Sequence, residues 1–309
     1  MSTMATTFSV VITSYNYLQF VVEAVESALA QTRPAAQVIV VDDGSTDGSP
    51  AMLQERYGAD PRVTLLFGEN EGQLAAFQRG AAAATADVVC FLDADDRWKP
   101  QYLEKIGAVY DERRDVDFVF SDLQTFGIDN QDILYEDSKA PIDLGYTAIS
   151  TYFFVTWYGA PTSALSLRRR WADTVLDLPH SFRRQWKLCA DACLVHGASI
   201  LGARKFYLPT GCVEYRTHGS NGWWATRQQP ASLYLNGLRN YGIVRHYAWR
   251  SGLDDNCSVH SKNEYRTKPA PTRKERKRYA SLALRGDGPW WKRYERAIGI
   301  LLGRRRGRR

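Results

Sequence analysis

The sequence predicts an α/β protein in which helices flank a mainly parallel sheet. As far as residue 121, apolar runs of strand length alternate with amphipathic stretches of helical length, which is the pattern of consecutive strand–helix units. The central run, 88–92, is apolar without alternation, as is typical of a strand buried on both faces. With 309 residues, 44% of them hydrophobic, the chain is long enough for one or two domains with a sizeable core.

The spacing of apolar residues, and the residues that begin helices, predict the strands and helices of this first part. Val21, Val25 and Leu29 fall on one side of the first expected helix, and Pro100 opens the fourth. Strands are expected at 8–13, 38–41, 63–67, 88–92 and 116–121, and helices at 18–32, 49–57, 73–84 and 100–113.

Carboxylates follow two of the expected strands. Asp42 and Asp43 end the second strand, and Asp93, Asp95 and Asp96 end the central one. The carboxyl ends of parallel strands form the edge at which open α/β sheets bind ligands. Clustered acids repel one another unless a cation neutralises them, and Mg²⁺ or Mn²⁺ prefers such oxygen ligands together with phosphates. The alternative is an acidic turn in which Asp96 caps the next helix.

A glycine-rich phosphate loop is missing, since neither GxGxxG nor GxxxxGKS occurs in the sequence. A diphosphate at this edge would therefore have to be held by a metal ion and by side chains.

The pattern is weaker after residue 121. The segment 122–158 is rich in aromatic residues and is either an irregular excursion over the sheet or a wall that faces a sugar acceptor. A strand is expected at 162–167 and helices at 168–175 and 186–197. Asp191 lies in the apolar surroundings of the last helix, where a carboxylate is costly without a partner or a role.

The C-terminal region differs in charge from the rest of the chain. From residue 262 onward it contains 17 Lys and Arg against 4 Asp and Glu, whereas the whole chain has a net charge of +6. Helix is expected within 222–260 and a polar, basic linker at 260–278. A helix at 290–302 places Trp290, Trp291 and Tyr294 on one face, and arginines follow it. Such a helix either binds an anionic membrane surface through 290–309 or packs on the domain. The acidic body argues against a nucleic-acid partner.

The cysteines and the lack of a visible targeting segment indicate where in the cell the protein is expected. The five cysteines have no paired spacing, which suits a reducing cytosol. Neither a signal peptide nor a membrane-spanning run is visible. The expected location is cytoplasmic. If the segment 290–309 binds a membrane, the protein would attach peripherally to the cytoplasmic face of the inner membrane.

Several of these residues form an ordered series of motifs. The series is Ser14-Tyr15-Asn16, Val40-Val41-Asp42-Asp43-Gly44-Ser45-Thr46-Asp47, Asn70-x-Gly72, Phe91-Leu92-Asp93-Ala94-Asp95-Asp96, the later Asp191, and Tyr215-Arg216-x-His218. In order and spacing it resembles the family 2 inverting glycosyltransferases, which have the GT-A fold of the nucleotide-diphospho-sugar transferase superfamily. The resemblance covers residues 8–221, about two thirds of the chain.

The resemblance implies a role for each matching residue. Ser14, Tyr15 and Asn16 would lie at the nucleotide, Asp43 would accept a hydrogen bond from the base, and Asp42 would support the loop. Asn70 and Arg79 would lie near the base or the phosphates. Asp93 would bind the ribose, Ala94 would also belong to the nucleotide-sugar site, and Asp95 would ligate Mn²⁺ or Mg²⁺, with His218 as a further ligand. Asp191 would be the general base.

The resemblance also implies an organisation and an activity. A catalytic domain would span 1–221, with donor binding at 8–121 and the acceptor half at 122–221, followed by a helical extension at 222–260 and the basic region at 261–309. The reaction would move a sugar, with UDP as the carrier, to a glycan or lipid-linked acceptor in the synthesis of a cell-surface polysaccharide.

Some features depart from the family pattern. Ala190 stands where the family often has Glu before its catalytic Asp, and the Gln-x-x-Arg-Trp motif of processive synthases is missing. Two alternatives are a sugar-phosphate nucleotidyltransferase, which needs a glycine-rich loop after the first strand, and a non-catalytic carbohydrate-binding or scaffold protein on the same fold.

Overall fold

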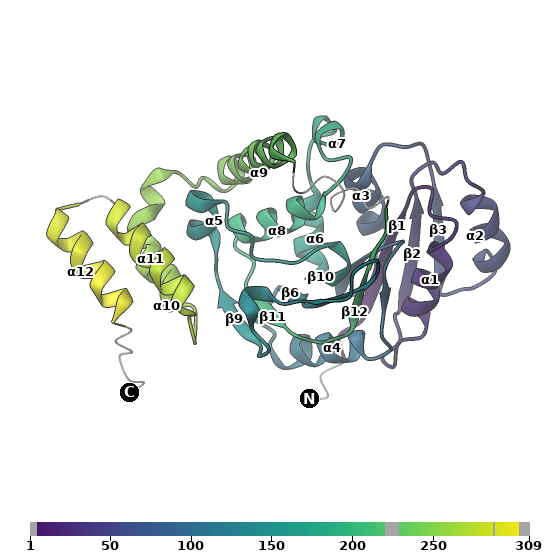
Figure 1. Cartoon of the computed structure of the whole chain (residues 1–309), viewed down its shortest axis with the longest axis horizontal. Helices are drawn as coiled ribbons and strands as arrows, with labels where there is room; N and C mark the ends of the chain where they lie inside the picture. The colour runs from purple at the N-terminus through teal and green to yellow at the C-terminus, as the bar shows by residue number, and fades with distance from the viewer. Residues whose placement is uncertain (1–4, 220–228, 287, 303–309) are drawn as a thin grey trace.

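The centre of the molecule is an eight-stranded mixed sheet with the order β3-β2-β1-β4-β10-β6-β11-β9 (Figure 1). This computed structural model describes residues 5–219, 229–286 and 288–302. The strands β3, β2, β1 and β4 run parallel, and helices cover the sheet. The predicted α/β class with a mainly parallel sheet is therefore confirmed.

The first part of the chain follows the predicted alternation. Every residue of β1 is buried, as expected for a central strand with covered faces. The elements are β1 (Phe8–Ser14), α1 (Val21–Leu29), β2 (Gln37–Asp42), α2 (Ser49–Tyr57), β3 (Val63–Phe67), α3 (Gln73–Ala83), β4 (Val88–Asp93), α4 (Tyr102–Glu112) and β6 (Phe118–Ser121).

The pairing register decides where polar residues gather. Ser14 of β1 lies opposite Asp42 of β2, and Thr13 lies opposite Asp93 of β4. The three strands therefore end side by side, and the residues that follow them share one edge of the sheet.

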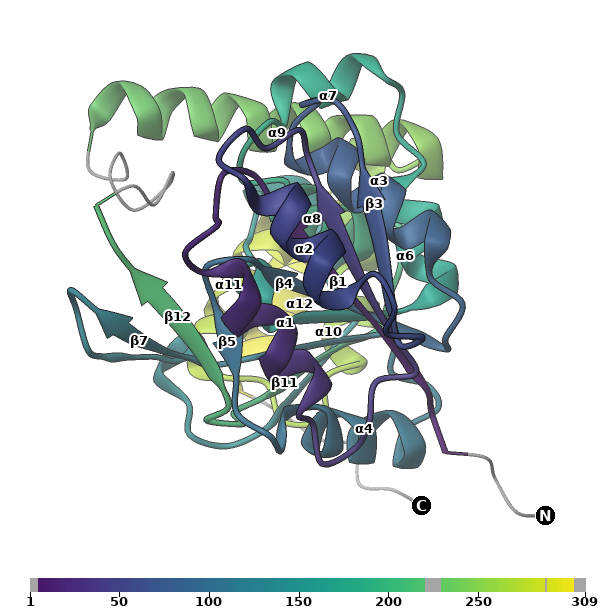
Figure 2. The same ribbon diagram turned by 90° about the vertical axis from the view of Figure 1, so that its right-hand side faces the viewer.

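The second part of the chain adds the antiparallel strand β10 (Leu165–Arg168) between β4 and β6. It also forms a small second sheet with the order β5-β12-β7-β8, part of which Figure 2 shows at one side of the molecule. The remaining strands are β5 (Arg97–Trp98), β7 (Leu123–Gly127), β8 (Asp132–Ile133), β9 (Ile142–Gly145), β11 (Lys205–Leu208) and β12 (Val213–Thr217). The helices are η1 (Tyr135–Asp137), α5 (Ala148–Phe154), η2 (Thr162–Ala164), α6 (Arg169–Leu176), α7 (Ser181–Gln185) and α8 (Asp191–Ile200).

The predicted helix at 186–197 was wrong in its bounds. Helix α7 ends at Gln185, and α8 begins only at Asp191, because Cys189 adopts a left-handed conformation with φ +61° that a helix cannot contain. Asp191 therefore occupies the first turn of α8 rather than its interior. A carboxylate is stabilised there by the positive end of the helix dipole.

The predicted linker at 260–278 was also wrong. The C-terminal elements are α9 (Pro230–Ser251), η3 (Asp255–His260), α10 (Ser261–Arg266), α11 (Arg273–Arg285) and α12 (Trp290–Leu301), so the basic segment is largely helical. Thr272 and Glu275 form a reciprocal capping box that begins α11. The helix expected within 222–260 corresponds to α9, while 220–228 lie outside the described residues.

Buried polar contacts attach this C-terminal region to the rest of the protein. Glu264 accepts hydrogen bonds from the backbone N–H groups of Ile149 (2.8 Å) and Ser150 (3.1 Å) at the start of α5. Lys268 and Glu275 form a fully buried ion pair at 3.2 Å, and the Lys268 ammonium also donates to the carbonyl oxygen of Tyr146. The high local charge that suggested a mobile linker is therefore partly compensated inside the fold.

The ion pair leads to a prediction about stability. Lys268→Met should lower the free energy of unfolding by about 3–5 kcal/mol, because Glu275 would remain buried without its counter-charge. Urea denaturation would measure the loss. The double variant Lys268→Met/Glu275→Met should be less destabilised than the single one, and the exposed Lys277→Met serves as control. A loss below about 1 kcal/mol for Lys268→Met would show that the pair is not important for folding.

Candidate functional site

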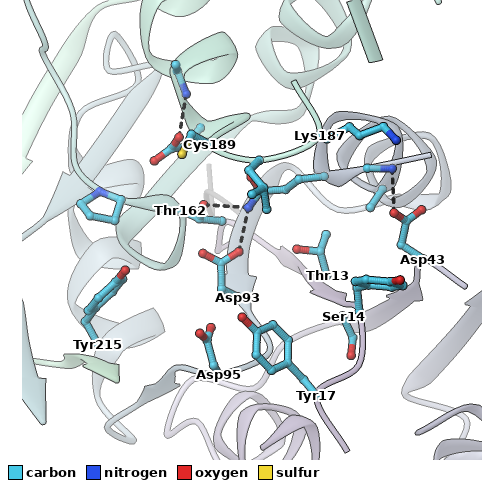
Figure 3. A pocket seen from close by; sticks show the side chains of 18 of the residues that line it. Thr13, Ser14, Tyr17, Asp43, Asp93, Asp95, Thr162, Lys187, Cys189 and Tyr215 are labelled. Carbon is cyan, nitrogen blue, oxygen red and sulfur yellow. Dashed lines mark hydrogen bonds between the residues drawn. The ribbon is translucent and has the colours of Figure 1, made fainter. Parts of the chain in front are cut away.

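A cavity of about 620 Å³ opens where β1, β2 and β4 end (Figure 3). Its walls come from distant parts of the chain. The strand ends contribute Ser14, Asp43 and Asp93, β12 contributes Tyr215, and Asn236 and Asn240 reach it from α9.

Seven of the residues predicted from the sequence line this one cavity. They are Ser14, Tyr15, Asp43, Asn70, Asp93, Asp95 and Asp191. Five others do not line it, namely Asn16, Asp42, Arg79, Ala94 and His218, and the contacts of these five explain their positions.

Asp43 connects the end of β2 to the loop that precedes α3. Its carboxylate accepts hydrogen bonds from the backbone N–H groups of Gly72 (2.7 Å) and Glu71 (3.2 Å) and pairs with Arg79 at 2.6 Å. Burial raises the pKa of Asp43 above its ordinary value, although these donors act in the opposite direction. Arg79 thus reaches the cavity through Asp43, and Asp43 positions the loop that carries Asn70.

Asn16 and Asp42 hold the loops after β1 and β2 together. The side-chain oxygen of Asn16 accepts from the N–H of Thr46 (2.8 Å), and Asp42 accepts from the N–H of Ser45 (2.8 Å). Asn16 has φ +56°, a conformation that asparagine tolerates better than most residues. Ala94 is completely buried. These residues support the walls of the cavity rather than forming them.

The acidic cluster after β4 has the composition of a divalent-cation site. Asp93, Asp95 and Asp96 each place a carboxylate oxygen within 4.8 Å of the others. Burial, and then the neighbouring charges of Asp95 and Asp191, raise the pKa of Asp93 to about 8. Burial, with Asp95 next, also raises the pKa of Asp96 well above its ordinary value. Three crowded hard oxygen ligands fit Mn²⁺ or Mg²⁺, which would relieve this repulsion.

Asp96 and His218 hold the cluster from its buried side. Asp96 accepts hydrogen bonds from the hydroxyl of Ser163 (2.5 Å) and the backbone N–H of Arg216 (2.7 Å). His218 Nε2 lies 3.0 Å from Asp95 Oδ2, and its ring packs against Tyr17 and Phe20. His218 therefore reaches the predicted metal ligand, although it does not line the cavity itself.

Asp191 enters the cavity from the first turn of α8. Its Oδ1 accepts a hydrogen bond from the N–H of Ala192 at 2.9 Å. Burial raises the pKa of Asp191 to about 6, against the opposing effects of this bond and of Arg239. A carboxylate with such a pKa can accept a proton near neutral pH.

Gln73 joins the two halves of the site and was not predicted. Its amide nitrogen donates to Asp93 Oδ1 (3.1 Å), while its amide oxygen accepts from the N–H of Ala190 (2.9 Å), next to Asp191. The only indication in the sequence is that Gln73 directly follows the Asn70-x-Gly72 motif. Its hydrogen-bond partners, Asp93 and Ala190, are distant in the sequence.

Lys187 was also not predicted from the sequence. Its position is fixed by a close approach between its backbone and that of Gly72. A Cβ atom on Gly72 would lie 2.6 Å from the Cα of Lys187, and Gly72 has φ +93°. The backbone N–H of Gln73 donates to the carbonyl oxygen of Lys187 (3.0 Å). Glycine is therefore required at position 72, and Lys187 brings a positive charge to a cavity rich in carboxylates.

Two tyrosines complete the wall around the acidic cluster. Figure 3 shows Tyr17 and Tyr215 beside Asp95 and Asp93. Burial, and then the nearby carboxylates, raise the pKa of both phenols above the ordinary value, so both remain neutral donors.

Comparison with known proteins gives matches in sequence and in structure. A family model described as glycosyl transferase family 2 matches residues 9–171, more than half of the chain. An uncharacterized glycosyltransferase of Nostoc sp. is 36% identical over 217 residues, which are 69% of this chain and 65% of that protein. Chondroitin synthase of Escherichia coli is 34% identical over 125 residues, 35% of this chain and 17% of that protein. The chain thus spans less than two thirds of the length of these relatives.

The structural match extends over nearly the whole chain. The crystal structure of S. aureus TarS 1–349 in complex with UDP-GlcNAc superimposes with a TM-score of 0.55 at 16% identity, covering 96% of this chain and 91% of that one. This similarity confirms the GT-A fold that the sequence resemblance implied.

The acidic cluster allows a direct test with a metal ion. Asp95→Asn should weaken the binding of Mn²⁺ at least about tenfold, because one of three clustered ligands loses its charge. Electron paramagnetic resonance of free Mn²⁺ during titration would measure the affinity. Asp173→Asn, on the exposed side of α6, is the matched control. Equal affinities for the two variants would exclude Asp95 as a ligand.

Proposed function

This chain belongs to glycosyl transferase family 2, and we propose that it transfers a sugar from a nucleoside diphosphate sugar to the hydroxyl group of a glycan or lipid-linked acceptor. The family recognised from the sequence motifs is thereby confirmed. One observation carries the proposal: a single cavity contains both the acidic end of β4 and the separate carboxylate Asp191, whose pKa is about 6.

The donor would occupy the part of the cavity formed by the first half of the chain. Tyr15 and Asp43 follow β1 and β2, and Asn70 lies in the loop before α3; the nucleotide base would bind between them. UDP is the proposed carrier, supported by TarS, whose crystal structures include complexes with UDP and UDP-GlcNAc. Asp93 would contact the ribose, and Lys187 would add charge opposite the diphosphate.

Asp93, Asp95 and Asp96 would hold the divalent cation, Mn²⁺ or Mg²⁺, near the diphosphate. Such an ion, when bound, neutralises charge that develops on the leaving nucleoside diphosphate. His218 and Gln73 orient Asp95 and Asp93 through the hydrogen bonds described above. These contacts keep the acidic side chains in place before the donor arrives.

Asp191 would act as the general base in a single inverting displacement. The acceptor oxygen forms a bond to the anomeric carbon while the bond from that carbon to the diphosphate oxygen breaks, and the hydroxyl proton passes to the Asp191 carboxylate. The products are the glycosylated acceptor and the nucleoside diphosphate. The proposed setting is the synthesis of a cell-surface glycan or polysaccharide; a relative named chondroitin synthase supports the glycan product.

The two alternatives make different predictions for a donor screen. Release of nucleoside diphosphate from UDP-sugars, with and without Mn²⁺ and with added glycan acceptors, would test the transferase. A nucleotidyltransferase would instead release pyrophosphate when given a nucleoside triphosphate and a sugar 1-phosphate, and a binding protein would show donor affinity without turnover.

The proposed base can be tested through kinetics and pH. Asp191→Asn should lower kcat by about 10²–10⁴ while donor affinity stays close to that of the wild type, since the loss is that of proton transfer. In the wild type, kcat should fall as the pH drops through about 6, because the base works only when deprotonated. If Asp191→Asn abolished donor binding but left turnover of the bound donor intact, Asp191 would be a binding residue.

We extend the proposal to the location of the protein, which would lie peripherally on the cytoplasmic face of a membrane. Within the described residues, no helix has both the length and the apolar character needed to cross a bilayer. Helix α12 packs on the protein through Ala297 and Ile300, which are 4% and 1% exposed. Its aromatic residues point elsewhere, since Trp290 is 69%, Trp291 52% and Tyr294 54% exposed.

This helix has the composition expected for an anionic bilayer surface. Lys292, Arg293 and Arg296 accompany the exposed aromatic side chains, a combination typical of interfacial helices. The arginines at 304–306, 308 and 309 belong to the same predicted segment but lie outside the described residues.

A pair of tryptophan substitutions tests membrane binding without removing the packed face of α12. The variant Trp290→Ser/Trp291→Ser should lose co-sedimentation with vesicles of phosphatidylcholine and phosphatidylglycerol, and binding of the wild type should weaken at high salt. Trp249→Ser removes a tryptophan of α9 that is 79% exposed, more than either tryptophan of α12, and is the control. If both variants sedimented like the wild type, α12 would be a packing element only.

A further inference from the structure

A second cavity of about 400 Å³ adjoins the first and is not part of the donor site. Trp157 and Pro161 line both cavities, so the two lie next to each other along this segment. Asp191 lies in the first cavity, and the second extends from Trp157 toward α11. A chain-like molecule that reacts at Asp191 would therefore reach the second cavity past Trp157 and Pro161.

Two aromatic side chains give this cavity flat walls that are held in place. The Trp157 ring packs edge-on against the buried His196, with centroids 5.5 Å apart. The Tyr135 ring packs edge-on against Phe120 at 5.1 Å. Rigid aromatic surfaces present large, amphipathic contact areas at low entropic cost, which suits the apolar faces of sugar rings.

The cavity also carries an excess of positive charge. Its lining contains Lys274 and Arg278, one turn apart on α11, and a single carboxylate, Glu136. Arg278 donates to the hydroxyl of Tyr158 (2.9 Å) and lies 3.8 Å from Glu136, which also accepts a hydrogen bond from Thr272 (2.8 Å). These contacts orient Arg278 and compensate one positive charge, whereas Lys274 is exposed at the rim.

We propose that the second cavity binds the part of the acceptor beyond the reacting unit and selects acidic glycan chains that carry a carboxylate or a phosphate. The inference rests on the proposed transferase function and adds the acceptor class to it. The guanidinium and ammonium groups suit such anionic oxygens, and the aromatic walls suit the adjoining sugar. Lys274 and Arg278 lie beyond residues 9–171, so this selection would belong to the chain's own C-terminal region.

The test measures binding without turnover. The probes are a hyaluronan tetrasaccharide, which carries carboxylates, a glycerol phosphate oligomer, which carries phosphates, and the neutral chitotetraose. Saturation-transfer NMR and titration of tryptophan fluorescence would give the affinities. At least one acidic probe should bind more tightly than the neutral one, and the one that does identifies the anionic group.

The variant Lys274→Glu should weaken binding of that acidic probe at least about tenfold, the size expected from losing one charge-assisted contact and adding a repulsive one. Lys277→Glu makes the same change on an exposed position of α11 that does not line the cavity, and should bind as the wild type does. Tighter binding of the neutral probe, no binding of either acidic probe, or equal effects of the two variants would overturn the proposal.

The donor reaction reports separately on the proposed function. Hydrolysis of the donor by water needs no glycan acceptor, and it can be measured in the wild type and in Lys277→Glu. Donor turnover without selective binding of the acidic probes would refute only the acceptor class. Selective binding without donor turnover would refute only the transferase.

Discussion

The site depends on the register of three neighbouring strands. Because β1 pairs in parallel with β2 on one side and β4 on the other, Ser14, Asp42 and Asp93 reach the same edge of the sheet. The residues that follow these strands then place Asp43 and Asp95 in the wall of a single cavity, and Asp96 beside Asp93 and Asp95. Burial of so many carboxylates is unfavourable unless protons, hydrogen-bond donors or a cation compensate them. Much of the surrounding structure supplies such compensation, through Arg79, Ser163, Gln73 and the backbone of Arg216.

The first half of the fold was accessible from the sequence because its signals are local. The buried strands are short apolar runs, and the bounds predicted for 49–57 and 63–67 agree with α2 and β3. The errors arose where long-range contacts override local pattern. The apolar stretch at 186–197 was read as one helix, but Gly72 packs against Lys187, and the backbone reverses at Cys189 before α8 begins. The basic stretch at 260–278 looked like a linker because the buried pairing of Lys268 with Glu275 cannot be read from composition.

The same distinction applies to the site. Ser14, Asp43 and Asp93, which lie at or next to strand ends, were predicted to be together and do line one cavity. Gln73 and Lys187 were missed because their partners are distant in the sequence. Asn16, Asp42 and Ala94 occur within the motifs and yet do not line the cavity. A motif therefore identifies the segment that forms a site, while the direction of each side chain depends on turn geometry, as the positive φ of Asn16 illustrates.

The bridge formed by Gln73 has a mechanical consequence. One amide group contacts Asp93, on the donor side, and the backbone of Ala190, which precedes Asp191. Two further backbone hydrogen bonds, from Gln73 and Leu74 to the carbonyl oxygens of Lys187 and Trp186, tie the start of α3 to the same loop. The start of α3 and the start of α8 are therefore linked directly by hydrogen bonds. In the proposed reaction, a ligand that moves Gln73 as it binds at Asp93 would also move the backbone next to Asp191, so binding at Asp93 and the position of the Asp191 carboxylate would be coupled.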